Sequence, residues 1–168
     1  MFTKVGSKIF NVELLANASK YYIETNTLKA INGSLNSAVL NYNTLKYLDT
    51  IQTDNTSGSA MGVIALVGVG DTPVTAEDYR LDEMTVGGVD VNTIVQCTSA
   101  RFPVTTARGI SYLYQFTNTG SSAVTIKEIC ICLRLSQVEK YMLARKVIPP
   151  RTIQPNENVT FDFDINWF

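Results

Sequence analysis

Two carboxylates near the end of the chain have the spacing of a catalytic or metal-binding pair. Asp162 and Asp164 lie two residues apart, which on a β-strand places both side chains on one face. Such a pair could exchange protons with a substrate or hold a cation. Apolar residues alternate with them, however, at Val159, Phe161 and Phe163. We therefore interpret the two aspartates as the solvated face of an amphipathic strand.

The cysteines offer no recognisable catalytic or metal centre. Cys130 and Cys132 share a face of a predicted strand, and only Cys97 could join them as a ligand. The chain has no histidine, which excludes a Ser-His-Asp triad, a Cys-His pair and any imidazole ligand from this chain. Because free cysteine packs as a small apolar residue, we interpret all three as core. No metal and no cofactor are predicted.

A glycine motif and an acidic segment raise two further possibilities. Gly68 and Gly70 resemble half of a dinucleotide fingerprint, but the third glycine is missing and no helix should begin there. We interpret them as a turn at a strand end. The acidic segment that follows lacks the D-x-D-x-D-G order of a calcium loop, so the spacing does not predict a cation site. Its acidic residues are Glu77, Asp78, Asp82 and Glu83.

Aromatic side chains near both ends of the chain are the candidate partner contacts. Trp167 and Phe168 end the sequence, and Tyr21 and Tyr22 lie near its start. Buried aromatic anchors often dominate the binding energy of protein interfaces. Packing within this chain is the alternative for all four, with Trp167 closing the core of the last strand.

The charge pattern argues against nucleic acid and membrane partners. The chain has 14 basic and 15 acidic residues, a net charge of −1, and no basic run that would neutralise phosphates. No apolar stretch approaches the roughly 18 residues that cross a bilayer. The first residues lack the apolar core of a secretory signal, and three cysteines cannot all pair. We expect a chain that stays inside the cell during synthesis.

Length and composition predict one all-β domain. A chain of 168 residues suits a single domain. Charged residues make up only 17%, so Thr, Asn and Ser supply much of the polar surface, a mixture that favours short strands and tight turns. We expect an antiparallel β-sandwich, jelly-roll or immunoglobulin-like, with about eight strands and at most short helical turns. Residues 61–168 would form the core sandwich, with 1–60 less regular, as an arm or extension.

The strand pattern is clearest after residue 60. Residues 61–67 are apolar throughout, as in a strand buried on both faces. After Glu128, both alternating sets of residues 123–134 are apolar, which predicts either two buried faces or a β-bulge that switches the phase. The other predicted strands are 91–97, 110–117 and 159–167.

Turn signals divide these strands. Thr75 and Asp78 have the spacing of a capping box, which predicts one helical turn. Residues 118–121 predict a hairpin turn and residues 155–158 another turn, while Pro149-Pro150 excludes a helix.

Residues 1–60 carry a less regular pattern. Short strands are predicted at 21–23 and 38–40, with a turn at Asn32-Gly33. A helix over 35–48 is the alternative for the second of these strands.

Several segments resemble those of small virion proteins of tailed bacteriophages. They are GVGDTPVTAEDYRL at 68–81, TNTGSS at 117–122, IKEI at 126–129 and LARKVIPPRTIQP at 143–155, followed by the alternating strand. The resemblance covers about residues 61–168, mostly at turn and core positions, and Cys130 and Cys132 depart from it.

The resemblance implies a non-enzymatic β-sandwich in a virion: a capsid auxiliary or decoration protein, a head-fibre base or a tail part. Its partners would be other virion proteins, such as the major capsid, fibre or tail proteins, with homo-oligomers or lattice binding. A tail component that recognises host carbohydrate is the alternative, for which Tyr21, Tyr22, Tyr42 and Tyr47 are the clustered candidates. A carboxylate hydrolase is a third possibility, although no acidic pair sits in a recognisable motif.

Overall fold

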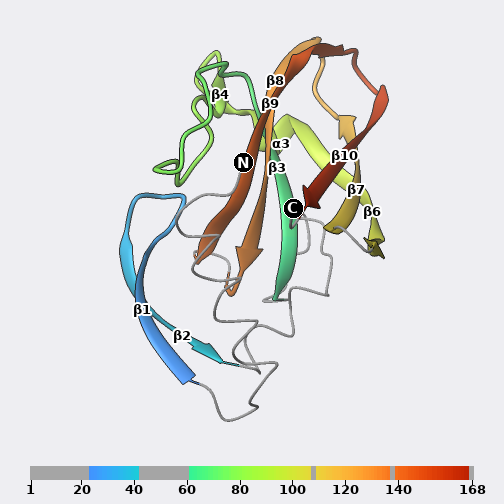
Figure 1. Cartoon of the computed structure of the whole chain (residues 1–168). Coiled ribbons are helices and arrows are strands. Elements are labelled where there is room, and N and C mark those ends of the chain that lie inside the picture. Colours follow the sequence, from blue (N-terminus) through green and yellow to red (C-terminus); the bar gives the residue numbers. More distant parts are fainter. Residues whose placement is uncertain (1–22, 42–60, 107–108, 137–138, 167–168) are drawn as a thin grey trace.

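The computed structural model describes residues 23–41, 61–106, 109–136 and 139–166. These residues form antiparallel β-sheets with one short helix, which confirms the predicted all-β class. Two three-stranded sheets make up most of the fold, one ordered β3-β8-β9 and the other β10-β7-β6 (Figure 1). Their strands are β3 (Gly62–Gly68), β6 (Val95–Thr106), β7 (Gly109–Asn118), β8 (Val124–Arg134), β9 (Lys140–Ile153) and β10 (Asn158–Asn166).

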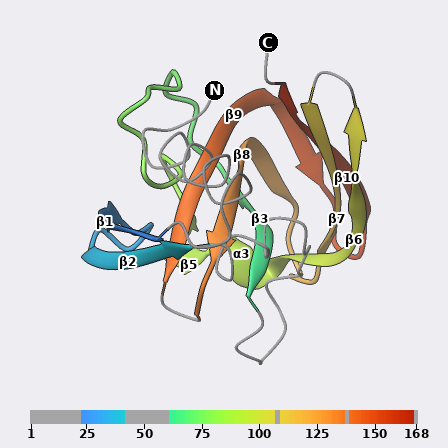
Figure 2. The same ribbon diagram turned by 60° about the horizontal axis from the view of Figure 1, so that its bottom comes forward.

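The two sheets pack face to face around one apolar core. Tyr112, Tyr114 and Phe116 line the buried face of β7, as the alternation of residues 110–117 predicted. They share one core cluster with Val63 of β3 and Ile131 of β8. The Tyr114 hydroxyl donates a hydrogen bond of 3.0 Å to the carbonyl of Val63, which joins the sheets directly. We call this side of the β3-β8-β9 sheet its first face (Figure 2).

Strand β8 contains both features that its sequence offered as alternatives, a β-bulge and two buried faces. Ile126 and Ile129 both lie on the first face, although they are three positions apart in the sequence, and the pairing with β9 is irregular between Ile126 and Glu128. A bulge therefore switches the phase. Beyond it every residue from Glu128 to Arg134 is buried, so both faces are covered as well.

Strand β9 contains a second irregularity that decides which side chains reach the opposite, second face. Its register with β8 shifts between Ile131 and Cys132, which inserts Leu143 as an extra residue. Leu143 and Ala144 then both pack in the first-face core. Met142 packs in the second-face cluster and Arg145 also reaches that side, although simple alternation would separate them.

The second face of the β3-β8-β9 sheet is covered by a loop and by a hairpin tip. A smaller cluster, here the second-face cluster, lies on this side, with Met84 and Ile31 packed against it. Met84 belongs to the loop of residues 69–84. Ile31 lies at the turn between β1 (Ile23–Lys29) and β2 (Leu35–Asn41), and its N–H donates to the carbonyl of Lys140. The second-face cluster consists of Ile64, Leu66, Leu81, Cys130, Cys132 and Met142.

The hairpin of β1 and β2 settles part of the prediction for residues 1–60. The turn at Asn32-Gly33 is confirmed, with Gly33 at a φ of 88°, and residues 38–40 lie in a strand. The alternative helix is wrong over Leu35–Asn41 because these residues pair in register with Ile23–Lys29. The remainder of that helix, 42–48, lies outside the described residues, as do Tyr21 and Tyr22.

The strand predicted over 91–97 is wrong in its first half. Val91–Ile94 forms the short helix α3, after the two-residue strands β4 (Thr85–Val86) and β5 (Val89–Asp90). The Asp90 carboxylate accepts the N–H of Asn92 and caps this helix. The Asn92 side chain in turn bonds the N–H and the C=O of Val67. These contacts outweigh the local strand propensity.

The turn predicted at 118–121 is present, but it is not a hairpin turn. It connects β7 of one sheet to β8 of the other. The buried side chain of Asn118 holds this crossover, because it accepts the N–H of Gly120 and donates to the carbonyls of Ser122 and Ile153. A turn signal alone does not specify whether the next strand pairs with the previous one.

The last strand follows its sequence pattern. Val159 and Phe163 are buried, while Asp162 and Asp164 are exposed, and a turn precedes it with Asn156 at a φ of 63°. Trp167 and Phe168 lie outside the described residues. Over the described ranges, no helix is long and apolar enough to cross a membrane.

Candidate functional site

The strongest concentration of buried charge in the described residues is a cluster of Arg145, Glu128 and Asp78, here the Arg145 cluster. Arg145 on β9 and Glu128 on β8 both point to the second face, where the side chain of Glu128 is fully buried. Asp78 belongs to the loop of residues 69–84. The cluster therefore joins this loop to two neighbouring strands.

Glu128 fastens the two ends of the loop. Its carboxylate accepts backbone N–H groups from Gly70 at 3.2 Å, Asp82 at 3.0 Å and Glu83 at 2.9 Å. It also accepts the Nε–H of Arg145 at 2.7 Å. A buried carboxylate needs such donors to offset its lost hydration, and here four of them surround it.

Two glycines, Gly68 at the end of β3 and Gly70 in the loop, are required by this close approach. A Cβ at Gly68 would lie 2.5 Å from Oε1 of Glu128 and 2.7 Å from the carbonyl oxygen of Glu83. A Cβ at Gly70 would lie 2.5 Å from a carboxylate oxygen of Asp82. The interpretation of these residues as a strand-end turn is confirmed, and the physical reason is lack of space.

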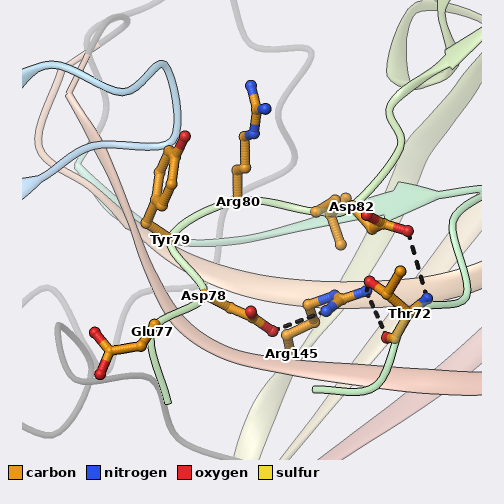
Figure 3. Close-up of a pocket in the computed structure, with 8 residues that line it drawn as sticks. Thr72, Glu77, Asp78, Tyr79, Arg80, Asp82 and Arg145 are labelled. Atoms are coloured by element: carbon orange, nitrogen blue, oxygen red, sulfur yellow. Dashed lines mark hydrogen bonds and ion pairs between the residues drawn. The ribbon is translucent and has the colours of Figure 1, made fainter. Parts of the chain in front are cut away.

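Arg145 fastens the middle of the loop. Its Nη1 donates to Asp78 at 2.8 Å, and its Nη2 donates to the carbonyl of Thr72 at 3.1 Å (Figure 3). Asp78 also accepts the hydroxyl of Thr75 at 2.7 Å and its N–H at 3.1 Å. The predicted helical turn is wrong, since residues 75–78 form a turn without a helix. Asp78 binds Thr75 and Arg145 together instead of starting a helix.

Asp78 and Arg145 each shift the pKa of the other by direct contact. Burial alone would raise the pKa of Asp78, but hydrogen bonds from Arg145 and Thr75 outweigh it and hold this pKa below the usual value. Burial alone would lower the pKa of Arg145, but Asp78 and Glu128 raise it above its usual value. The pair is therefore charged across the neutral range.

A hollow of about 230 Å³ opens beside the Arg145 cluster. Figure 3 shows Glu77 and Arg80 directed away from Arg145, and the Lys29 ammonium lies 3.7 Å from the ring centre of Tyr79. Each of the three nitrogens of Arg145 already donates to a protein oxygen. The charged groups of the Arg145 cluster therefore bond to the loop of residues 69–84 and hold it in place.

The cysteines are core residues, as interpreted from the sequence. All three are buried, and the sulfurs of Cys130 and Cys132 lie 3.7 Å apart on the second face. Burial raises the pKa of the Cys130 thiol, which keeps it protonated and unreactive. Among the residues that the structure describes, no three acidic or cysteine side chains form a group that could hold a metal ion.

The residues proposed from the sequence do not converge on one site. Asp162 and Asp164 stay side by side on an exposed strand face, and the four aromatic candidates lie outside the described residues. Glu128 and Arg145 were not singled out. The available signal was a charged residue inside an apolar run, IKEICIC for Glu128 and YMLARKV for Arg145, because buried charges are rare unless paired.

Comparisons with known protein families, with curated proteins and with solved structures find no match for this chain.

Proposed function

We propose that this chain is a structural protein of a bacteriophage virion, most simply a capsid auxiliary, decoration or head-fibre-base protein. It would act by packing against other virion proteins, such as the major capsid protein, and not by catalysis. The proposal starts from the resemblance of residues 61–168 to small virion proteins and from the all-β sandwich.

One observation carries the proposal: three of the four segments that resemble virion proteins meet in a single contact network. The segment 68–81 supplies Gly70, Thr72 and Asp78, the segment 126–129 supplies Glu128, and the segment 143–155 supplies Arg145. These residues are far apart in the sequence but bond to each other in the structure, so the three segments belong to one structural unit. The shared pattern describes how a loop is built onto a sheet, which supports a structural role.

The chemistry of the described residues agrees with a packing role. The buried charges of the Arg145 cluster bind each other and the backbone, and the carboxylates Asp162 and Asp164 face solvent. Catalytic groups are usually found where their pKa is tuned toward neutrality in a cleft. Here the pKa of Asp78 moves away from neutrality.

The direct test is the protein content of purified particles. Mass spectrometry of phage particles, purified by density gradient from cells that make this chain, should detect it at a constant ratio to the major capsid protein. A host cytosolic protein followed through the same gradient is the control for contamination. Cryo-electron microscopy of these particles would assign the protein to the head or the tail. Its absence from intact particles would overturn the proposal.

A further inference from the structure

The two main sheets have four edge strands: β3 and β9 in one sheet, β10 and β6 in the other. An edge strand presents unpaired N–H and C=O groups that can pair with another chain. Proteins block such edges with proline, bulges, charged side chains or side-chain contacts unless the edge has a use. The four edges of this fold differ in this respect.

Strand β3 is blocked by side chains. The amide of Asn92 bonds both the N–H and the C=O of Val67, at 2.9 and 3.0 Å, and Tyr114 bonds the carbonyl of Val63. These backbone groups point away from β8, so an added strand would have to displace Asn92 and Tyr114.

Strands β6 and β9 are blocked by their irregular backbones. Strand β6 contains Pro103 and shifts register twice against β7. Strand β9 contains Pro149-Pro150 and shifts register twice against β8. Each proline removes a donor, and each irregularity breaks the even spacing that an added strand needs.

Of these devices, strand β10 carries only charged side chains in its described residues, Asp162 and Asp164. It pairs with β7 over nine consecutive residues without a register shift, and its sequence NVTFDFDIN contains no proline. Within the described residues, no backbone hydrogen bond beyond the β7-β10 ladder is made by Thr160, Asp162 or Asp164. Strand β10 is the one regular and open edge of the two sheets in the part of the chain that the structure describes.

The register shows which residues face the open edge. The N–H of Asn118 donates to the carbonyl of Glu157 at 3.1 Å, and this pair continues the β7-β10 ladder. Bonding alternates along an antiparallel pair, so the odd-numbered residues of β10 bond to β7. Thr160, Asp162 and Asp164 therefore direct their backbone groups outward, and their side chains are exposed on one face.

We propose that β10 is an assembly edge that takes an extended segment of a partner protein as an additional antiparallel or parallel strand. Basic side chains at alternate positions of that segment would face Asp162 and Asp164. Apolar side chains at the intervening positions would continue the row of Val159, Phe161 and Phe163, in which Phe161 is still only half-buried. This inference rests on the proposed function, because a structural protein of a virion needs a surface that binds another virion protein.

The negative charge of β10 favours a different protein, and not a second copy of this chain, as the added strand. Pairing of two β10 strands would bring four carboxylates onto one sheet face, from Asp162 and Asp164 of each copy. Like charges on neighbouring strands destabilise a sheet, and opposite charges stabilise it. A segment rich in lysine or arginine is the complementary occupant.

The test uses the full-length chain and the peptide acetyl-KVKVKVK-amide, with acetyl-EVEVEVE-amide as the matched control. Residue-resolved hydrogen exchange should show the amides of Thr160, Asp162 and Asp164 slowed about tenfold by the lysine peptide at saturation. The dissociation constant of the glutamate peptide should be at least about fivefold higher than that of the lysine peptide. A lysine peptide N-methylated at alternate residues on its pairing side should give no protection.

A pair of variants tests the edge itself. Thr160→Pro removes an outward N–H that β7 does not use, so the fold should persist by circular dichroism while peptide protection is lost. Thr160→Ala, the matched control, should keep both the fold and the protection by the peptide. If Thr160→Pro fails to fold, the N-methylated peptide still decides the question.

Two results would overturn the inference: no protection of β10 by the lysine peptide, or equal protection by both peptides. Protection of β10 in a dimer of the free chain would replace the proposed partner with a second copy. Absence of the chain from particles overturns the proposed function and leaves this peptide experiment decisive for the edge. Presence in particles without peptide protection removes only the inference.

Discussion

The two faces of the β3-β8-β9 sheet are covered in different ways. The first face meets a second sheet through aliphatic and aromatic side chains such as Val63, Ile131 and Phe116. The second face carries a smaller apolar cluster under a loop without regular structure. That loop is fastened by the hydrogen bonds of Glu128 and Arg145. Buried apolar area therefore holds one face, and a smaller apolar cluster together with a few directional bonds holds the other.

This difference predicts two kinds of failure. Loss of a contact on the first face should lower the stability of the whole domain, because both sheets share that core. Loss of a contact on the second face should release the loop first, as a local opening. The cysteines report on the two sides separately: Cys97 belongs to the first-face core, and Cys130 and Cys132 belong to the second-face cluster.

The largest effect is expected from Arg145→Ala. The change leaves Glu128 as a buried charge without its cation, and breaking a buried ion pair costs about 3–5 kcal/mol. Urea unfolding would measure the loss of stability. Alkylation below the unfolding midpoint, mapped by mass spectrometry, should modify Cys130 and Cys132 well before Cys97. Equal modification of all three thiols would show that the faces do not open separately.

A smaller effect is expected from Leu81→Ala. Leu81 is the apolar residue of the loop that is fully buried in the second-face cluster, and truncation of a buried leucine costs about 2–5 kcal/mol. The same thiols should become accessible, while hydrogen exchange of the β7 amides stays slow. The first-face counterpart is Phe116→Ala, which should expose Cys97 and the other two cysteines together. A common pattern for both variants would contradict the distinction between the faces.

The contribution of Asp78 should depend on pH. Its pKa is lowered in the folded chain, so the stabilisation is complete above the unfolded value of 3.8 and is lost as the pH falls through the folded value. Asp78→Asn should cost about 1.5–3 kcal/mol near neutrality, as for a hydrogen bond to a charged group. The difference between wild type and variant should shrink below pH 3.8. A difference that is constant down to acid unfolding would assign the effect to shape and not to charge.

The first face could be predicted from the sequence, and the second only in part, because the apolar runs predicted that it is covered but not which residues cover it. Alternation in residues 110–117 and 159–164 identified the side chains of the sandwich core. A strand with one buried and one solvent-exposed face alternates apolar and polar residues with a period of two. The second face depends on two register shifts: one brings Glu128 to this side, and the other places Met142 and Arg145 there together. A bulge is set by tertiary packing and leaves little trace in the local pattern.

Two of the corrected elements have a related cause. Residues 91–94 read as a strand, but the amide of Asn92 is bonded to Val67, 25 residues away in the sequence. Residues 118–121 read as a hairpin turn, but Asn118 bonds the carbonyl of Ile153 and directs the chain to the other sheet. In both cases a long-range side-chain contact selects the structure, and neighbouring residues do not encode it.

The smallest effect is expected from Arg151→Ala, the matched control for Arg145→Ala. Arg151 also lies on β9 and also donates to a carboxylate, Glu157, at 2.7 Å. Its side chain is 54% exposed, whereas that of Arg145 is 2% exposed. An exposed ion pair contributes about 0–1 kcal/mol because water and salt screen it. The unfolding midpoint should therefore change little and the thiols should stay protected. A loss as large as that of Arg145→Ala would mean that burial is not what separates the two arginines, and the comparison of the two faces would lose its physical basis.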